Sequence, residues 1–301
     1  MRTIFVRSFL ALSVLGATEV LAWGGKGHAT VNRIAIDMVA NPEAKKFLSA
    51  NSEQVIRFAN TPDVKWKSGP SASIEKPMHW FEMDGYNGNR FGEELPNMVF
   101  GRVRDELGQD FVGKYGLAMW RVSDFYVQLV AAIKKGDFKR AVQISGVMGH
   151  YVGDMTQPMH ASTDYDGQSI NKPGIHKYYE TTLVDRINEQ HLVDVVQRAA
   201  GERRSGFERS IGNDLEATEL QKVSWTEAGD AFTALDPVLK RFDRSTPDDQ
   251  WLEQDLTPRI GRASALLGKI WDVAFTVAGT GNLPSGNVDA RDPEWIPMSQ
   301  N

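Results

Sequence analysis

Apolar side chains recur every three or four residues along most of this chain, which is the period of an amphipathic helix. The clearest stripe runs from Leu117 to Lys134, and a second one runs from Leu256 to Val277. No stretch alternates apolar and polar residues as a half-buried strand does. The pattern therefore predicts an all-α fold, built as a single mostly helical domain.

Glycine, proline and capping residues set the expected ends of the helices. We expect helices over residues 28–40, 52–58, 117–134, 175–196, 214–235 and 256–277, a short helix that opens at Pro42, and a long one from Phe138 to just before Pro158. Residues 65–104 and 162–174 carry the glycines, prolines and asparagines typical of irregular segments. The tail after about residue 280 has no periodic pattern, and we expect it to be loosely structured.

The first 22 residues have the pattern of a secretory signal peptide: two arginines, a short apolar core and a small-residue cleavage site that ends at Ala22. A cleavage site after Ala17 is the alternative. The segment is too short to span a membrane. Cleavage after Ala22 would start the mature chain at Trp23, which predicts a secreted or periplasmic protein whose residues 23–301 form one domain.

Composition narrows the function classes. The formal net charge is −5 at pH 7, which argues against a generic basic surface for nucleic acid. A local nucleic-acid site is still allowed, because bound divalent cations would reverse the charge there. The chain has no cysteine, so it has neither disulfides nor a cysteine-based structural zinc site.

One short stretch concentrates potential metal ligands. His150 and Asp154 are four residues apart, so on a helix both side chains project from the same face. Pro158 ends that helix and leaves His160 on a turn just beyond it. One segment could therefore serve two neighbouring metal ions.

The other potential ligands are spread along the chain. They are His28 on the first expected helix, Asp63 on a loop, His79 in an irregular segment, and the pair His176 and Glu180, which are again four residues apart. A single histidine is usually an ordinary packed or surface group, and we interpret His191 in that way. The other five histidines together with three carboxylates supply the nitrogen and oxygen donors that zinc accepts. They are too many for one ion, and several neighbouring ions favour phosphoryl chemistry.

Two other metal chemistries have signatures that this chain lacks. The His-Glu-x-x-His pattern of zinc peptidases is absent. No histidine is followed directly by aspartate, so the adjacent His-Asp pair of another helical phosphohydrolase group is absent too.

The order His-x-x-Gly-Asp-x-x-Gln-Pro-x-His over residues 150–160 resembles the exported superfamily of zinc-dependent phospholipases C and single-strand-specific nucleases. The resemblance covers Trp23 to about Arg186, and the C-terminal third is similar only in its helical character. Members of the superfamily are helical and bind three zinc ions. The resemblance therefore implies an exported, zinc-dependent phosphodiester hydrolase with three Zn²⁺.

The resemblance also implies a ligand set for each ion. One zinc would be held by Asp63, His79, His150 and Asp154, and a second by His160, His176 and Glu180. The third would use His28, Asp154 as a bridge, and the free amino group and carbonyl of Trp23. An uncleaved chain would lack this amine, which ties the third site to removal of the leader.

By the same resemblance, a metal-activated water attacks the phosphorus atom. Asp63 and Asp154 are candidate catalytic residues, because the first would orient or deprotonate that water and the second would join two ions. Glu82 is the third candidate. It follows His79 by three residues, at a position where relatives usually carry an aspartate.

The substrate is harder to assign, because the chain mixes features of the two branches. The start Trp23-Gly24-x-x-Gly27-His28 is nuclease-like, whereas the glutamate at position 180 is phospholipase-like. Residues 163–168 retain only a degraded form of a nuclease loop. We favour a phospholipase C that acts on phospholipid head groups. A single-strand nuclease or 3′-nucleotidase is the alternative, and a non-catalytic zinc-binding protein is the remote one.

Four residues near the ligands in sequence are candidate substrate contacts: Lys65, Trp66, Phe81 and Tyr165. The aromatic rings could stack on a base or enclose a choline cation. Ordinary packing of the rings, and a solvated turn for the lysines beside Trp66, are the alternatives. The expected partners are phospholipid or single-stranded nucleic acid, with peripheral membrane contact and no transmembrane segment. We expect a monomer.

Overall fold

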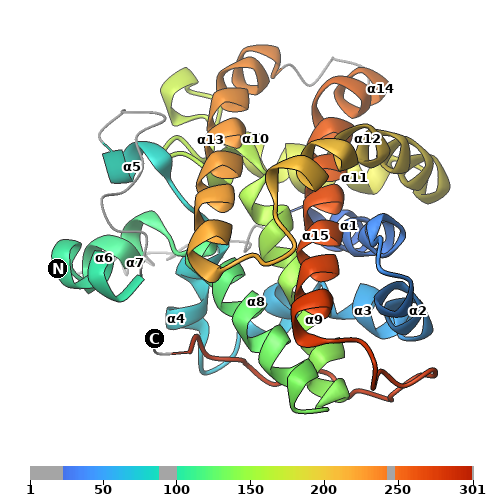
Figure 1. Cartoon of the computed structure of the whole chain (residues 1–301). Coiled ribbons are helices and arrows are strands. Elements are labelled where there is room, and N and C mark those ends of the chain that lie inside the picture. The colour runs from blue at the N-terminus through green and yellow to red at the C-terminus, as the bar shows by residue number, and fades with distance from the viewer. Residues whose placement is uncertain (1–22, 88–99, 243–247, 300–301) are drawn as a thin grey trace, which may run out of the picture.

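The computed structural model describes residues 23–87, 100–242 and 248–299, and within these ranges every regular element is helical. The all-α prediction is confirmed (Figure 1). The longer helices are α1 (Gly24–Met38), α2 (Pro42–Ala50), α3 (Ser52–Phe58), α8 (Ala118–Lys134), α9 (Phe138–Met155), α12 (Glu189–Ser210), α13 (Ala217–Arg241) and α15 (Thr257–Ala278). Among the described helices, none is both long and apolar enough to cross a membrane.

Shorter helices and single turns connect these elements. The short α-helices are α4 (Ala72–Glu75), α5 (Met83–Asn87), α6 (Phe100–Leu107), α7 (Gln109–Tyr115), α10 (Ile175–Lys177), α11 (Leu183–Arg186) and α14 (Asp248–Trp251). The 3₁₀ turns are η2 (Lys76–His79), η3 (Pro158–His160) and η4 (Gln168–Ile170). The π turns are η1 (Pro62–Trp66), η5 (Tyr178–Thr182) and η6 (Leu252–Leu256).

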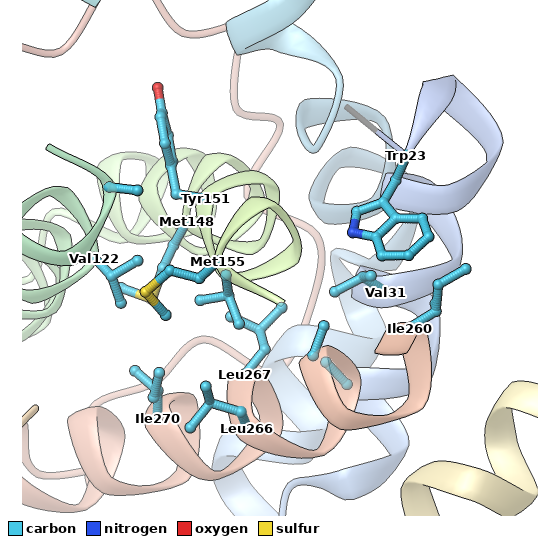
Figure 2. Close-up of a cluster of buried hydrophobic side chains, with 14 of the residues drawn as sticks. Trp23, Val31, Val122, Met148, Tyr151, Met155, Ile260, Leu266, Leu267 and Ile270 are labelled. Atoms are coloured by element: carbon cyan, nitrogen blue, oxygen red, sulfur yellow. The ribbon is translucent and has the colours of Figure 1, made fainter. Parts of the chain in front are cut away.

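Helix α9 runs through the middle of the molecule and contacts α1, α3, α8 and α15. Nearly every residue from Ala141 to Met155 is buried, which is the behaviour of a helix that is covered on all sides. Figure 2 shows Met148 and Met155 of α9 in the same apolar cluster as Val122 of α8 and Leu267 of α15. The last turn of α9, which carries the predicted ligands, is therefore fixed by the core.

Two glycines of α9 let α1 approach closely. A Cβ atom at Gly149 would lie 1.7 Å from Oδ1 of Asn32, and one at Gly153 would lie 3.0 Å from Nδ1 of His28. In the space that remains, Asn32 Nδ2 donates a hydrogen bond to the carbonyl of Gly146 at 2.8 Å. The missing side chains thus bring His28 against the end of α9, beside Asp154.

Several expected boundaries are wrong. Helix α1 begins at Gly24, four residues before the expected start. Asp63 lies on the π turn η1 and not on a loop. The helix expected over residues 175–196 is interrupted, because Ile187 is extended with φ −72° and ψ 137°. Asn188 then caps a new helix, α12, and accepts a hydrogen bond from the main-chain N–H of His191 at 3.1 Å.

The segment expected to be irregular, residues 65–104, contains the short elements α4, η2 and α5 and the start of α6. Its residues 88–99 lie outside the described ranges, as do residues 1–22, where the signal peptide is predicted. The expected ends of α9 are confirmed: Asp137 caps its first turn, and Pro158 follows its end.

The C-terminal tail, residues 279–299, contains no helix or strand, but it is packed against the helices. In Figure 1 it runs from the end of α15 along the ends of α9 and α8. Gln143 of α9 donates to the carbonyl of Arg291 at 2.9 Å, and Arg121 of α8 donates to the carbonyl of Ile296 at 2.6 Å. Ile296 is completely buried. The tail is irregular, yet it is anchored at many points.

Candidate metal centre

Four predicted ligands from three elements meet at the end of α9; we call them the Asp154 cluster. They are Asp63 of η1, His79 of η2, and His150 and Asp154 of α9, all at most 5% exposed. His79 Nδ1 lies 3.0 Å from Asp154 Oδ2 and 2.9 Å from His150 Nε2. His150 Nε2 lies 3.3 Å from Asp154 Oδ2 and 3.4 Å from Asp63 Oδ1. The facing nitrogen of each histidine therefore lies near both carboxylates and the other ring.

The outer contacts of the two histidines fix which ring nitrogen faces inward. His150 Nδ1 lies 2.8 Å from the carbonyl of Ala59, to which it can only donate. His79 Nε2 lies 3.2 Å from Oε1 of Glu75, where it donates to a carboxylate. In the neutral rings the facing nitrogens, His150 Nε2 and His79 Nδ1, carry the lone pairs and are directed at the carboxylates of Asp63 and Asp154.

This arrangement of four acceptors fits a cation. Ligands bonded to zinc at about 2.0–2.1 Å in a tetrahedron are separated by about 3.3 Å. The contacts within the Asp154 cluster run from 2.9 Å, between His79 and His150, to 3.7 Å, between His79 and Asp63, and so bracket that value. Lys67 Nζ, 2.7 Å from Asp63 Oδ1, supplies one positive charge, and a cation among the ligands would add more beside the two buried carboxylates.

Electrostatics lead to the same conclusion. Burial raises the pKa of Asp154 to about 6, although His150 beside it acts in the opposite direction. Burial, and secondarily His150, holds the pKa of His28 well below its ordinary value. Burial does the same for His79, with a smaller contribution from Lys67. Although burial acts against it, Asp154 and Asp63 together raise the pKa of His150. A neutral imidazole is the form that binds metal, so metal binding would release a proton from His150, and a bound cation would restore the charge of Asp154.

A second group of predicted ligands, which we call the Glu180 cluster, consists of His160 of η3, His176 of α10 and Glu180 of η5. Oε2 of Glu180 lies 3.5 Å from His160 Nε2 and 2.9 Å from His176 Nε2. His160 Nδ1 donates to the carbonyl of His79, so in the neutral ring Nε2 is the nitrogen that faces Glu180 with a lone pair. His176 Nε2 is buried and, despite its short distance to Glu180, makes no aligned hydrogen bond. Both features suit ligands around a shared ion.

His28 lies on the other side of Asp154. Its Nε2 is 3.5 Å from Asp154 Oδ1, and neither that oxygen nor either ring nitrogen of His28 has a hydrogen-bond partner. Three buried polar atoms without partners are unusual. An ion between His28 Nε2 and Asp154 Oδ1 would give two of them a partner. Trp23 lies close by, since its indole N–H donates to the carbonyl of Gly153 at 2.7 Å. Its own carbonyl accepts from the N–H of Gly27 at 3.0 Å.

A cavity of about 750 Å³ opens onto His79, His160 and His176. Its other lining residues are Lys67, Trp80, Glu82, Lys114, Tyr115, Met159, Thr163, Tyr165 and Asp166. Burial, together with the neighbouring Asp84, raises the pKa of Glu82 to about 7. The wall therefore combines cations and aromatic rings with a carboxyl group that can exchange a proton near neutral pH.

The structure brings only one of the four predicted substrate contacts to this cavity. Tyr165 lines it and is 50% exposed. Trp66 is buried and donates to the carbonyl of Pro293 at 3.3 Å. Phe81 is buried against Tyr86, Trp120 and Trp225. Lys65 is exposed and pairs with Asp292. For Trp66 and Phe81 the packing alternative describes what is seen, and Lys65 faces the tail.

Sequence reasoning missed two buried charged residues. Lys67, which was expected on a solvated turn, is only 8% exposed, and its Nζ lies 2.7 Å from Asp63 Oδ1. Glu75 is completely buried and contacts His79 Nε2. The spacing of Glu75 and His79, four residues on a helical segment, was the only signal for it.

The fold and the site define a class: a helical protein in which two clusters of buried histidines and carboxylates, able to hold metal, lie beside a cavity. The sequence profile of the family described as zinc dependent phospholipase C matches residues 27–224, more than half of the chain. The chain belongs to this family. A zinc requirement follows at the level of the family, and the two clusters supply suitable donors.

Three known proteins resemble the chain at low identity. The alpha toxin from Clostridium absonum is 18% identical with a TM-score of 0.58, over 84% of this chain and 65% of the toxin. An alpha toxin of Clostridium perfringens from an avian strain is 15% identical with a TM-score of 0.51, over 83% of this chain and 62% of the toxin. A Bradyrhizobium tropiciagri protein described as a probable serine protease is 19% identical over 91% of this chain.

This chain aligns with only part of each of these proteins. The chain spans 46% of the curated relative and less than two thirds of either toxin. At such identities the solved structures show the fold alone, and that fold is helical, as here.

Proposed function

We propose that this protein is an exported zinc phospholipase C that hydrolyses the phosphodiester between a lipid and its head group. The observation that carries the proposal is the presence of two clusters of buried histidines and carboxylates beside one cavity, which His79, His160 and His176 line. Membership of the zinc dependent phospholipase C family supports it. We further propose three zinc ions: one in the Asp154 cluster, one in the Glu180 cluster, and one between His28, Asp154 and the amino group and carbonyl of Trp23.

The third site gives the proposed export a chemical role. Trp23 begins the described chain and contacts Gly153, which precedes Asp154. Cleavage after Ala22 would free the amine of Trp23, and we propose that it joins His28 and Asp154, whose facing atoms have no hydrogen-bond partner. N-terminal sequencing of the protein recovered from outside the cytoplasm would test this, and a mature chain that starts elsewhere would contradict it.

When bound, zinc supplies positive charge against the phosphate and acidifies a water towards a pKa of about 7. The chain's own residues do the rest. Glu82 lines the cavity and can take a proton near pH 7. Lys67 holds Asp63 in place, and Lys114 lies at the cavity wall where an anionic phosphate would enter. Trp80 and Tyr165 offer ring faces to a head group or lipid.

The name of the Bradyrhizobium relative suggests a different chemistry, acyl transfer by a serine. Such a site needs a serine hydroxyl hydrogen-bonded to a histidine. In the part of the chain that the structure describes, the histidine rings contact carboxylates, main-chain carbonyls and each other, and none bonds to a serine. We therefore do not propose a serine protease.

The deciding experiment compares substrates. Purified mature protein with zinc is incubated in parallel with phosphatidylcholine vesicles and with single-stranded DNA and RNA. We expect release of phosphocholine, and no release from the Asp154→Asn variant prepared in the same way. Nucleotide release without phosphocholine release would replace the proposal with the nuclease. Zinc binding without either activity would favour a non-catalytic zinc protein.

A further inference from the structure

The C-terminal tail reaches the metal centre through one carboxylate. The indole N–H of Trp295 donates to Oε2 of Glu75 at 2.7 Å, across 220 positions of sequence. The other oxygen of Glu75, Oε1, accepts from the hydroxyl of Tyr151 and contacts His79 Nε2 at 3.2 Å. A completely buried carboxylate thus joins the tail to a ligand of the Asp154 cluster.

The contact of Glu75 with His79 determines how that ligand faces the cluster. By holding the proton of His79 on Nε2, Glu75 leaves the lone pair of Nδ1 directed at Asp154 and His150. A ligand histidine whose outer nitrogen is bonded to a carboxylate is oriented and made more basic. Glu75 must therefore be held in place for this arrangement to persist.

The tail supplies part of what fixes Glu75. Arg121 is completely buried, and it lies 3.6 Å from Glu75 Oε2 and donates to the carbonyl of Ile296 at 2.6 Å. Trp295 therefore holds the carboxylate of Glu75, and Ile296 next to it holds the guanidinium of Arg121 that faces this carboxylate. Without the indole N–H, Oε2 would lose its hydrogen bond and keep only the longer contact with Arg121, among the contacts of the described residues.

Other contacts of the tail hold Trp295 at this place. Asp292 pairs with both Arg57 and Lys65. The N–H of Val288 donates to Asn51 Oδ1 at 2.9 Å, and the N–H of Ser299 donates to Asp124 Oδ1 at 2.8 Å. The tail is thus tied to the helices before and after Trp295, so that the indole does not depend on its own bond for its position.

We propose that the tail is a strap for the metal centre, in which Trp295 is a positioning residue that acts through Glu75 on His79. The inference rests on the proposed zinc site at the Asp154 cluster. It gives the C-terminal segment a role in metal retention that is separate from its packing. The Glu180 cluster has no contact of this kind with the tail among the described residues, so the strap should act on one zinc site selectively.

The test measures zinc affinity by competition with a chelator, for the wild type and for Trp295→Phe, which keeps an aromatic ring and loses the N–H. We expect one zinc per chain to bind about 10-fold more weakly and the other ions to bind as before. Changes to residues that hold a metal ligand in place lower metal affinity by about 10–100-fold, and this is the lower end of that range. Gln143→Met is the matched control, because it removes a tail hydrogen bond, to the carbonyl of Arg291, that does not involve Glu75. We expect wild-type zinc affinity in that control.

A double variant separates positioning from general stability. If Trp295 acts through Glu75, adding Trp295→Phe to Glu75→Gln should weaken zinc no further than Glu75→Gln alone. Full additivity, or equal losses in Trp295→Phe and Gln143→Met, would overturn the strap. A wild-type protein that binds no zinc would instead overturn the proposed metal site itself.

Discussion

The Asp154 cluster and the Glu180 cluster meet beyond the end of α9, but the chain builds them in different ways. The Asp154 cluster draws on η1, η2 and α9, and its ligands are at most 5% exposed. The Glu180 cluster comes from residues 160–180, on a 3₁₀ turn, a short helix and a π turn. His79, His160 and His176 face the cavity, whereas His150, Asp63 and Asp154 do not line it.

This difference suggests that a metal ion in one cluster would mainly stabilise the fold, whereas a metal ion in the other would mainly contact the substrate. A cation in the Asp154 cluster would neutralise carboxylates within the core, so its binding energy should also stabilise the fold. A cation in the Glu180 cluster would lie at the cavity wall, where it would meet substrate with less effect on the fold. The following predictions test this contrast, from the largest expected effect to the smallest.

The largest effect is expected from Asp154→Asn. Asp154 lies between His79, at 3.0 Å, and His28, at 3.5 Å, so we expect loss of two zinc ions and more than a 100-fold loss of activity, since outer-shell changes alone cost about 10–100-fold. Glu180→Gln is the paired variant and should lose one ion, with a smaller drop in melting temperature. Zinc analysis and thermal unfolding check both. Equal losses of zinc and of melting temperature in the two variants would contradict the proposed difference between the clusters.

Glu82→Gln should cost about 100-fold in kcat if Glu82 is the general base. Burial raises its pKa to about 7, so the group is protonated below that pH and ionised above it. Wild-type activity should therefore rise with pH through about 7, and the variant should lose that rise. Because the folded pKa is raised, ionisation also lowers stability as pH rises towards 7, and the variant should escape that loss. An unchanged pH profile would exclude the role.

Gly149→Ala tests whether the close approach of α1 and α9 sets the His28 side of the cluster. The new Cβ would lie 1.7 Å from Asn32 Oδ1, so we expect destabilisation by about 1–3 kcal/mol and weaker zinc binding. Gly201→Ala in α12 is the control, with open space at its Cβ and an expected gain of about 0.5–1 kcal/mol. Urea unfolding compares the two. Tolerance of Gly149→Ala would show that the helices can separate without loss of the site.

The smallest effect is expected from Lys114→Met at the cavity wall. Lys114 is exposed, so its attraction to a phosphate should contribute at most about 1 kcal/mol, seen as a rise in KM of about fivefold. Lys65→Met should leave KM unchanged, because Lys65 faces Asp292, which Arg57 also holds. Steady-state kinetics on vesicles compare them. A rise in KM for Lys65→Met but not for Lys114→Met would show that Lys65 contacts the substrate, as the sequence predicted.

The contrast between the clusters also explains what the sequence could predict. The pairs His150/Asp154 and His176/Glu180 are visible because helical spacing places their members on one face, and the helix that carries the first pair ends where Pro158 requires. The predicted helix over residues 175–196 was wrong because the apolar period continues through Ile187, whereas Asn188 caps a new helix there.

The contacts that cross the fold could not be read from local pattern. Lys67 was interpreted as part of a solvated turn, but the fold brings its Nζ to within 2.7 Å of Asp63 Oδ1. Glu75 is bonded to Trp295, 220 positions away, and no spacing rule connects such residues. Single aromatic residues were equally ambiguous: Trp66 and Tyr165 both lie near ligands in sequence, yet one packs in the core and the other lines the cavity.

Anomalous diffraction at the zinc edge, from crystals of the mature protein grown with zinc, tests the central claim most directly. We predict peaks among Asp63, His79, His150 and Asp154, among His160, His176 and Glu180, and between His28, Asp154 and the amino group of Trp23. Zinc bound elsewhere on the surface, with both clusters free of anomalous density, would contradict the account.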